Sequence, residues 1–400
     1  MVPRDWSVRF MRGDAPSAPI EHQESRSVDC LFIFITNSGF LSLSIQLMTV
    51  TDYESSNQKD KTVQVYILMG QSNMLGKGQV GTPEHDANHD GTLCCACHSK
   101  GLYPYLLDAA TNDWTTREDV RYVFTMGNGV QPNPQYKHNE WLTVHNGGTI
   151  GPEIGIGHVV GNHQPGTAPV LLLKTCIGNR SLGWDLLPPG SSEFSYRESD
   201  GVTWVHPGYH GSPEKWKQGT TPQPIDWYAG MQYDGDVQRA KDVLADIETF
   251  VPGATGYSIA GFFWWQGDKD SRNEGLADHY EVNLTALIRQ LRVEFDTPKA
   301  PFVCATLGQT PINCDPTTCE GKILYAMLRA ARNPEFQGNV STVYTHPLSR
   351  GGSSGSHYNL NAETYMNVGE AMGQAMVELQ SLARCNDRNS RATILQNVNT

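Results

Sequence analysis

Short apolar runs of strand length are spaced along the chain. Five of them, at residues 63–69, 169–174, 257–265, 302–307 and 340–344, are rich in β-branched, aromatic and other apolar side chains. Runs of this kind are typical of strands that are buried on both faces of a sheet. The pattern therefore predicts five buried strands.

Longer segments with helical periodicity lie between most of these runs. In residues 232–250 apolar side chains recur every three or four positions, as on one face of an amphipathic helix, and Pro252 follows. Strands that alternate with helices predict a mostly parallel, five-stranded sheet covered on both faces, which is an α/β fold with three α/β/α layers. The other predicted helices span 152–162, 276–295, 320–332 and 361–383.

Two long segments show little periodicity. Residues 80–150 are predicted as a loop-rich insertion, and residues 184–230 are rich in Pro, Gly, Trp and Tyr. An irregular segment as long as the second is uncommon in a compact domain unless it has a function. We therefore expect it to face a ligand.

The first 60 residues lie outside this alternation. Residues 31–47 form an apolar stretch that several polar residues interrupt, which makes it marginal as a bilayer span. Basic residues precede it, as in a secretory signal, so we expect export to the periplasm or the medium. The alternative is a true start at Met48 or later. Both interpretations leave residues 1–60 as an N-terminal extension with a polar linker, residues 61–384 as the folded domain and residues 385–400 as a tail.

Composition narrows the classes of function. Hydrophobic residues make up 38% of the 400 residues, enough for a sizeable core, and the formal net charge is −12. No basic stripe stands out, so nucleic-acid binding is not expected. An integral membrane domain is not expected either, because the apolar stretch at 31–47 is only marginal as a bilayer span. The oligomeric state is not predicted.

The chain has nine cysteines, some of which could bind a metal ion. Cys94, Cys95 and Cys97 lie close together, and a soft metal ion would need a second ligand pair, for which only Cys314 and Cys319 are candidates. No further pair with zinc-ligand spacing occurs, so ordinary loop cysteines are favoured. We predict no metal and no cofactor.

Candidate chemistry lies where predicted strands end, because ligands bind at the carboxyl ends of the strands in such sheets. The first strand leads into Gly70, Gln71 and Ser72. A serine at a tight strand-to-helix turn presents its hydroxyl at the sheet edge, as a nucleophile must, and a helix N-cap is the alternative. Gly178 follows the second strand and offers an unobstructed N–H to an oxyanion, although a simple turn explains it equally well.

Two later strand ends offer an acid and a base. The strand at 257–265 leads into Gln266 and Asp268. The amide of Gln266 can donate to an oxyanion, and the carboxylate of Asp268 can orient a histidine. A charged loop is the alternative. His357 lies on a Gly/Ser-rich loop after the last strand, where a mobile general base is well placed. The chain order Ser72, Asp268, His357 is that of a nucleophile, an acid and a base.

Together these segments resemble the SGNH-hydrolase superfamily, and within it the carbohydrate-esterase branch that includes sialate O-acetylesterase-like proteins and acetylxylan esterases. The matching segments follow the family's order across residues 62–380. They are Gly70-Gln71-Ser72-Asn73-Met74, Gly151-Pro152-Glu153, Gly178 with Trp184, Trp265-Gln266-Gly267-Asp268, and His357 followed by Asn361-Ala362-Glu363-Thr364-Tyr365. The resemblance implies a flavodoxin-like fold and a serine esterase that needs no metal.

The catalytic and binding roles known in the family can be assigned, residue by residue, to the matching positions of this sequence. The resemblance implies Ser72 as nucleophile, His357 as base, and an oxyanion hole made by the N–H groups of Ser72 and Gly178 with a side-chain amide. For the amide we assign Gln266, with Asn179 as competitor. The substrate-binding residues that the resemblance implies are Gln71, Asn73, Trp184 and Trp265.

The acid departs from the family's pattern in two ways. Many relatives have an acid three residues before the histidine, and here that position is Ser354. Others have Glu after the Gln-Gly pair, and here it is Asp268, which is one methylene shorter. We therefore assign the orienting acid to Asp268, with Asp270 as the alternative.

The implied substrate is an O-acetyl ester on a carbohydrate, of the acetylated-polysaccharide or sialic acid type. Aromatic side chains of the 184–230 segment suit stacking on sugar rings, and packing within the loop is the alternative. A carbohydrate-binding protein that has lost its chemistry is a rival function, because the acid positions have changed. A lipase or thioesterase of the same superfamily is another. The aromatic side chains are Trp184, Trp204, Tyr209, Trp216, Trp227 and Tyr228.

Overall fold

The computed structural model describes residues 62–164, 168–352 and 356–398. The expected export signal and linker in residues 1–60 lie outside the described residues, and they stay predictions. Among the helices that the structure describes, none combines the length and apolar character that a bilayer span requires.

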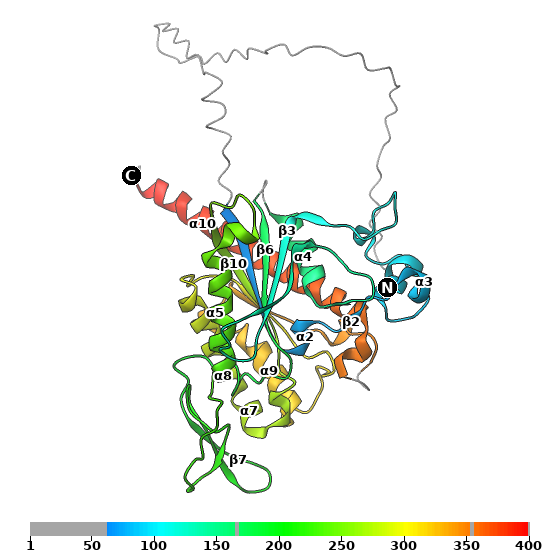
Figure 1. Cartoon of the computed structure of the whole chain (residues 1–400). Helices are drawn as coiled ribbons and strands as arrows, with labels where there is room; N and C mark the ends of the chain where they lie inside the picture. The colour runs from blue at the N-terminus through cyan, green and yellow to red at the C-terminus, as the bar shows by residue number, and fades with distance from the viewer. Residues whose placement is uncertain (1–61, 165–167, 353–355, 399–400) are drawn as a thin grey trace, which may run out of the picture. The chain divides into compact units, whose positions relative to one another are not determined.

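A seven-stranded sheet forms the centre of the fold (Figure 1). The five predicted strands are its adjacent members, all parallel, and this confirms the α/β fold class. The insertion at 80–150 adds two further strands, one parallel to its neighbour and the last antiparallel at the edge. In spatial order the strands are β12 (Val340–Val343), β11 (Phe302–Ala305), β10 (Gly256–Trp265), β1 (Thr62–Gly70), β6 (Val170–Thr175), β3 (Arg117–Met126) and β4 (Gln135–Leu142).

Helices cover both faces of this sheet because its central strands are apolar on both sides. In β1, Tyr66 and Leu68 pack in one core with α4 (Glu153–His163) and α10 (Ala362–Val398). Val65 and Ile67 alternate with them and pack in a second core on the opposite face. Figure 1 shows these layers. The helices of the second face are α5 (Met231–Ala245), α8 (Tyr280–Glu294) and α9 (Cys319–Ala330).

Shorter elements fill the connections. The predicted helix at 276–295 is interrupted at His279, so it forms α7 (Glu274–Asp278) followed by α8. The segment at 184–230 is not wholly irregular: it contains a three-stranded antiparallel sheet, whose first strand β7 (Phe194–Arg197) contacts α7. The remaining α-helices and strands are α2 (Ser72–Leu75), β2 (Gly78–Gln79), α3 (Pro83–Asp86), β5 (Thr149–Ile150), β8 (Thr203–His206), β9 (Trp216–Lys217) and α6 (Ile247–Phe250).

The clustered cysteines pack as core residues. Cys94, Cys95 and Cys97 are buried free thiols, and burial raises the pKa of Cys94 to about 11. Cys314 and Cys319 are likewise free. Within the described residues these side chains do not gather into a group of metal ligands.

Candidate active site

Ser72 stands at a sharp turn between β1 and α2. The strand ends at Gly70, whose φ is +147°, and a β-carbon there would lie 2.3 Å from the carbonyl oxygen of Trp265. The next residue, Gln71, donates its N–H to that same oxygen at 3.2 Å. Only glycine permits so close an approach at this φ, and the turn leaves Ser72 partly exposed as the first residue of α2.

The other end of α2 is held by a buried ion pair. Lys174 Nζ lies 2.6 Å from Glu153 Oε2, and both side chains are almost completely buried. The same ammonium donates to the carbonyl oxygen of Leu75, the last residue of α2, at 3.2 Å. It also lies over the rings of Tyr122 and Phe124, 5.4 and 5.1 Å from their centroids. The pair therefore connects β6 and α4 to the helix on which Ser72 is mounted.

Gly178 lies directly beside Ser72. A β-carbon placed on Gly178 would be 3.7 Å from Ser72 Cβ, so the loop after β6 and the start of α2 are in contact. Within the described part of the chain, neither of these two residues donates its backbone N–H in a hydrogen bond. Two unpaired N–H groups next to a serine hydroxyl are suited to bind an oxyanion.

Gln266, the predicted third oxyanion donor, is fully buried and fully engaged. Its Nε2 donates to Gln71 Oε1 at 3.1 Å, to the Arg180 carbonyl at 2.9 Å and to Asp270 Oδ2 at 2.5 Å. Its Oε1 accepts from Tyr280 at 2.8 Å. Donation to an oxyanion would require one of these bonds to be released, so this role stays a prediction.

The competitor, Asn179, differs in having an unused amide. It is exposed, adopts a left-handed φ of +57° and follows Gly178 directly. Among the described residues its side chain makes no hydrogen bond. An amide next to Gly178 without a partner can turn toward a ligand, so both candidates for the third donor stay open.

The two candidate acids have different environments. Asp268 is partly exposed, and its Oδ2 lies 2.6 Å from Nη2 of Arg272. Asp270 is fully buried and accepts from the N–H groups of Leu182 and Gly183 at 2.9 and 2.8 Å, besides Gln266. Burial raises the pKa of Asp270 to about 7, although these hydrogen bonds oppose the rise. The oxygens of Asp270 are thus occupied in holding the 182–183 loop.

His357 begins a run of four left-handed residues, with φ values between +52° and +60°. Burial and the neighbouring cations Lys77 and Arg272 lower the pKa of its half-buried imidazole, and the charge of Asp268 opposes them. Within the described residues no hydrogen bond joins Ser72, His357 and Asp268. The role of Asp268 as the acid that orients His357 therefore stays a prediction.

A hydrogen bond between their chain neighbours brings the serine and histidine segments together. Tyr358, which follows His357, is buried, and its hydroxyl accepts from Nδ2 of Asn73 at 3.2 Å and from the N–H of Gly308 at 3.1 Å. Asn73 follows Ser72. This bond spans 285 positions in the sequence, and no local pattern could have indicated it.

The residues predicted to bind substrate have packing or hydrogen-bonding roles in the structure. Gln71 and Asn73 are buried and engaged with Gln266 and Tyr358. Trp265 is fully buried, and its indole N–H donates to the Thr306 carbonyl at 3.0 Å. Trp184 packs in a small core with Leu187, Ala229 and Leu276. Contact of these residues with substrate stays a prediction.

Comparison with known proteins gives one family match. Residues 208–378 match the model of a family described as carbohydrate esterase, sialic acid-specific acetylesterase. This region includes Gln266, Asp268 and His357, whereas Ser72 and Gly178 precede it. A search of curated proteins finds no significant match.

Three solved structures are also similar to the chain. A protein from Arabidopsis thaliana is 16% identical, with 79% of this chain and 98% of that chain covered and a TM-score of 0.44. A carbohydrate acetylesterase from Xanthomonas citri is 12% identical, with 78% and 55% covered and a TM-score of 0.43. NanS is 12% identical, with 82% and 99% covered and a TM-score of 0.40. The family match confirms, over residues 208–378, the resemblance to sialate O-acetylesterase-like carbohydrate esterases that the motifs predict.

Proposed function

We propose that the protein is a serine esterase that hydrolyses O-acetyl esters on carbohydrates, with Ser72 as nucleophile, His357 as base and Asp268 as the orienting acid. The observation that supports this most is the contact of Gly178 with Ser72, because it brings two unpaired backbone N–H groups to one serine hydroxyl. The hydrogen bond between Asn73 and Tyr358 supports the pairing of Ser72 with His357. The family match supports a carbohydrate ester as substrate.

The proposed reaction is a two-step acyl transfer. His357 takes the hydroxyl proton of Ser72 as the serine oxygen bonds to the acetyl carbon, and the N–H groups of Ser72 and Gly178 bind the resulting oxyanion. When the ester bond breaks, the sugar oxygen leaves with the proton that His357 returns. A water molecule then attacks the acetyl-Ser72 ester, giving one proton to His357, and acetate leaves as Ser72 regains its proton.

Assays on esters of different acyl length and different alcohols test this function. We expect the full chain to release acetate from an aryl acetate and from acetylated xylan or an O-acetylated sialic acid, and to reject butyryl and longer esters. A preference for long acyl groups would favour the lipase or thioesterase alternative. Sugar binding without release of acetate from any of these esters would favour a protein that binds carbohydrate without catalysis.

The pH profile tests the assignment of His357 as base. Burial and Lys77 lower the pKa of His357, whereas Asp268 raises it. Since only the neutral imidazole accepts a proton, activity should fall off on the acid side at the pKa of this residue. Lys77→Ala should therefore move the acid limb of kcat/KM to higher pH, and Asp268→Asn should move it to lower pH.

The measurement is kcat/KM for an aryl acetate between about pH 4 and about pH 8 for the wild type and both variants. The position of the limb is independent of the absolute rate, so the loss of activity that Asp268→Asn also causes does not obscure the result. Shifts in the same direction, or none, would contradict the assignment of this limb to His357.

A further inference from the structure

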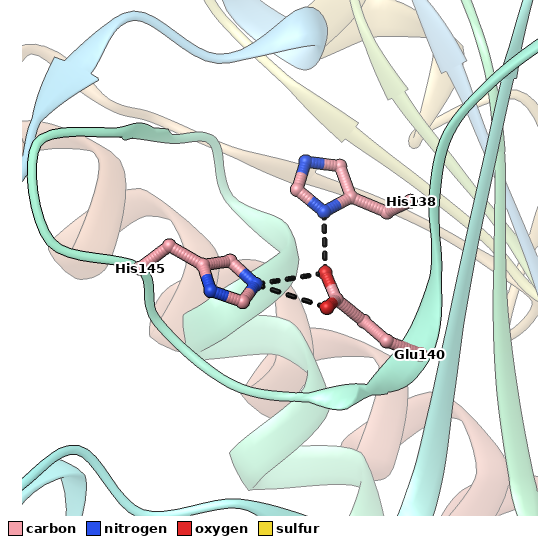
Figure 2. Close-up of side chains that lie close together, drawn as sticks. All are labelled: His138, Glu140 and His145. Atoms are coloured by element: carbon pink, nitrogen blue, oxygen red, sulfur yellow. Dashed lines mark hydrogen bonds and ion pairs between the residues drawn. The ribbon is translucent and has the colours of Figure 1, made fainter.

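Three side chains that commonly bind metal ions converge at the edge of the main sheet. His138 and Glu140 are two positions apart on the edge strand β4, so they lie on the same face, and His145 follows the end of that strand. Figure 2 shows the three side chains pointing toward one another. His138 Nδ1 lies 2.5 Å from Glu140 Oε1, and His145 Nε2 lies 3.0 Å from each carboxylate oxygen. In the part of the chain that the structure describes, this is the one group of three or more such ligands.

We propose that His138, Glu140 and His145 form a binding site for a divalent transition-metal ion, with Zn²⁺ as the ion that it fits best. Two imidazole nitrogens and one carboxylate oxygen are a common ligand set for zinc, with a fourth position left open to water. Calcium and magnesium prefer six or more oxygen ligands, which this site does not offer. Neither Ser72 nor any other residue of the candidate active site takes part.

The geometry fits an ion without large rearrangement. The three ligand atoms all lie within 4.8 Å of one another. Tetrahedral zinc, with bonds of about 2.0–2.2 Å, requires ligand atoms about 3.3 Å apart. The contacts of Glu140 with His138 and His145, now 2.5 and 3.0 Å, would widen toward this value as an ion enters.

One of the ligands is also held in place before a metal binds. The imidazole of His138 stacks on Tyr122, with ring centroids 5.1 Å apart, which restricts its rotation before a metal binds. A neutral imidazole binds a metal through one nitrogen and keeps its proton on the other. A bound ion would take the place of the hydrogen bonds between the two imidazoles and Glu140.

Binding would tie the connection between β4 and β5 to the edge strand. His145 lies in this connection, and β5 pairs with β2, which follows α2 closely in the chain. In the described residues the second ring nitrogens of His138 and His145 make no hydrogen bond. Hydrogen bonds to the second ring nitrogens of metal-binding histidines typically strengthen metal sites 10- to 100-fold, so we expect this site to bind zinc more weakly than one that has them.

Isothermal titration of the full chain with ZnCl₂, after removal of metals with EDTA, tests the proposal. We expect one site per chain in the wild type and a loss of affinity of about 30-fold or more in Glu140→Gln and in His145→Ala. His89→Ala is the matched control, because His89 pairs with a single carboxylate, Asp86, at 3.1 Å, and it should bind zinc as the wild type does. Saturating zinc should raise the melting temperature of the wild type and of the control only.

A spectroscopic measurement identifies the ligands directly. Electron paramagnetic resonance of the Cu²⁺ form should show coupling to two nitrogens in the wild type and to one in His145→Ala. His145 is half exposed in an irregular segment, so this variant should melt at the wild-type temperature without metal. Absence of a stoichiometric site in the wild type would overturn the proposal. A site retained at full affinity in both Glu140→Gln and His145→Ala would overturn it as well.

Discussion

Replacement of Ser72 by alanine is expected to lower kcat/KM for an aryl acetate by roughly 10⁴-fold or more, because the acetyl-enzyme can no longer form. The substitution removes one oxygen atom at the start of α2 and leaves the residue's backbone N–H in place. Folding should therefore be unaffected, since Ser72 is partly exposed and the turn is fixed by Gly70 and Gln71.

Ser271→Ala is the matched control for this experiment. Its hydroxyl donates to the Asp268 carbonyl at 2.9 Å, so it lies near the candidate acid without a proposed chemical role. Its kcat/KM should stay within a few-fold of the wild type. Mass spectrometry after treatment with a fluorophosphonate should find the label on Ser72. A Ser72→Ala variant with near-wild-type activity, or a label on another residue, would contradict the proposed nucleophile.

The sequence predicts the centre of the sheet well because these strands are buried on both sides. Their runs are continuously apolar, so they are recognisable without knowledge of their neighbours. β4 lacks this signal: it is an edge strand whose residues from Gln135 to Trp141 are all at least partly exposed. Its partner β3 begins with three charged residues, Arg117, Glu118 and Asp119. Polar strands at an edge resemble loops in a single sequence, which explains why residues 80–150 are predicted as a loop-rich insertion.

The sequence predicts which residues form the candidate site, but it does not predict the contacts that hold those residues in place. Ser72, Gly178, Asp268 and His357 follow strand ends, and the parallel sheet brings strand ends together. The contacts that hold these residues join distant elements, as between Asn73 and Tyr358. Left-handed conformations at consecutive non-glycine residues, as from His357 onward, have no reliable local signal either.

Of the contacts that hold the candidate site in place, the ion pair between Lys174 and Glu153 is the hardest to predict from the sequence. Lys174 reads in the sequence as the polar end of a buried strand, and its partner lies 21 positions earlier on a different element. Both charges are removed from water, so each depends on the other. Lys174→Met keeps the length and apolar stem of the side chain and leaves the Glu153 carboxylate buried without a cation. The free energy of unfolding should therefore fall by about 3–5 kcal/mol.

Arg329→Ala is a control of equal geometry in a different environment. Arg329 Nε lies 2.6 Å from Glu281 Oε2, the same separation as in the buried pair, but the side chains are 55% and 39% exposed. Water screens this pair, so its loss should cost less than about 1 kcal/mol. Urea unfolding at neutral pH measures both changes on one scale, provided that the denaturant slope is unchanged. Equal losses of unfolding free energy in the two variants would show that burial does not increase the contribution of the Lys174 ion pair to stability.

Measuring kcat/KM of the Lys174 variants shows whether the ion pair only stabilises the fold or also positions Ser72. Lys174 donates to the Leu75 carbonyl, so its loss should let α2 shift and lower kcat/KM by about 10- to 100-fold even where the variant is fully folded. The double variant Lys174→Met/Glu153→Gln removes both charges and should recover most of the stability, because no uncompensated charge remains. It should not recover the activity, because the bond to Leu75 stays absent. Recovery of both together would mean that the ion pair stabilises the fold without positioning the nucleophile.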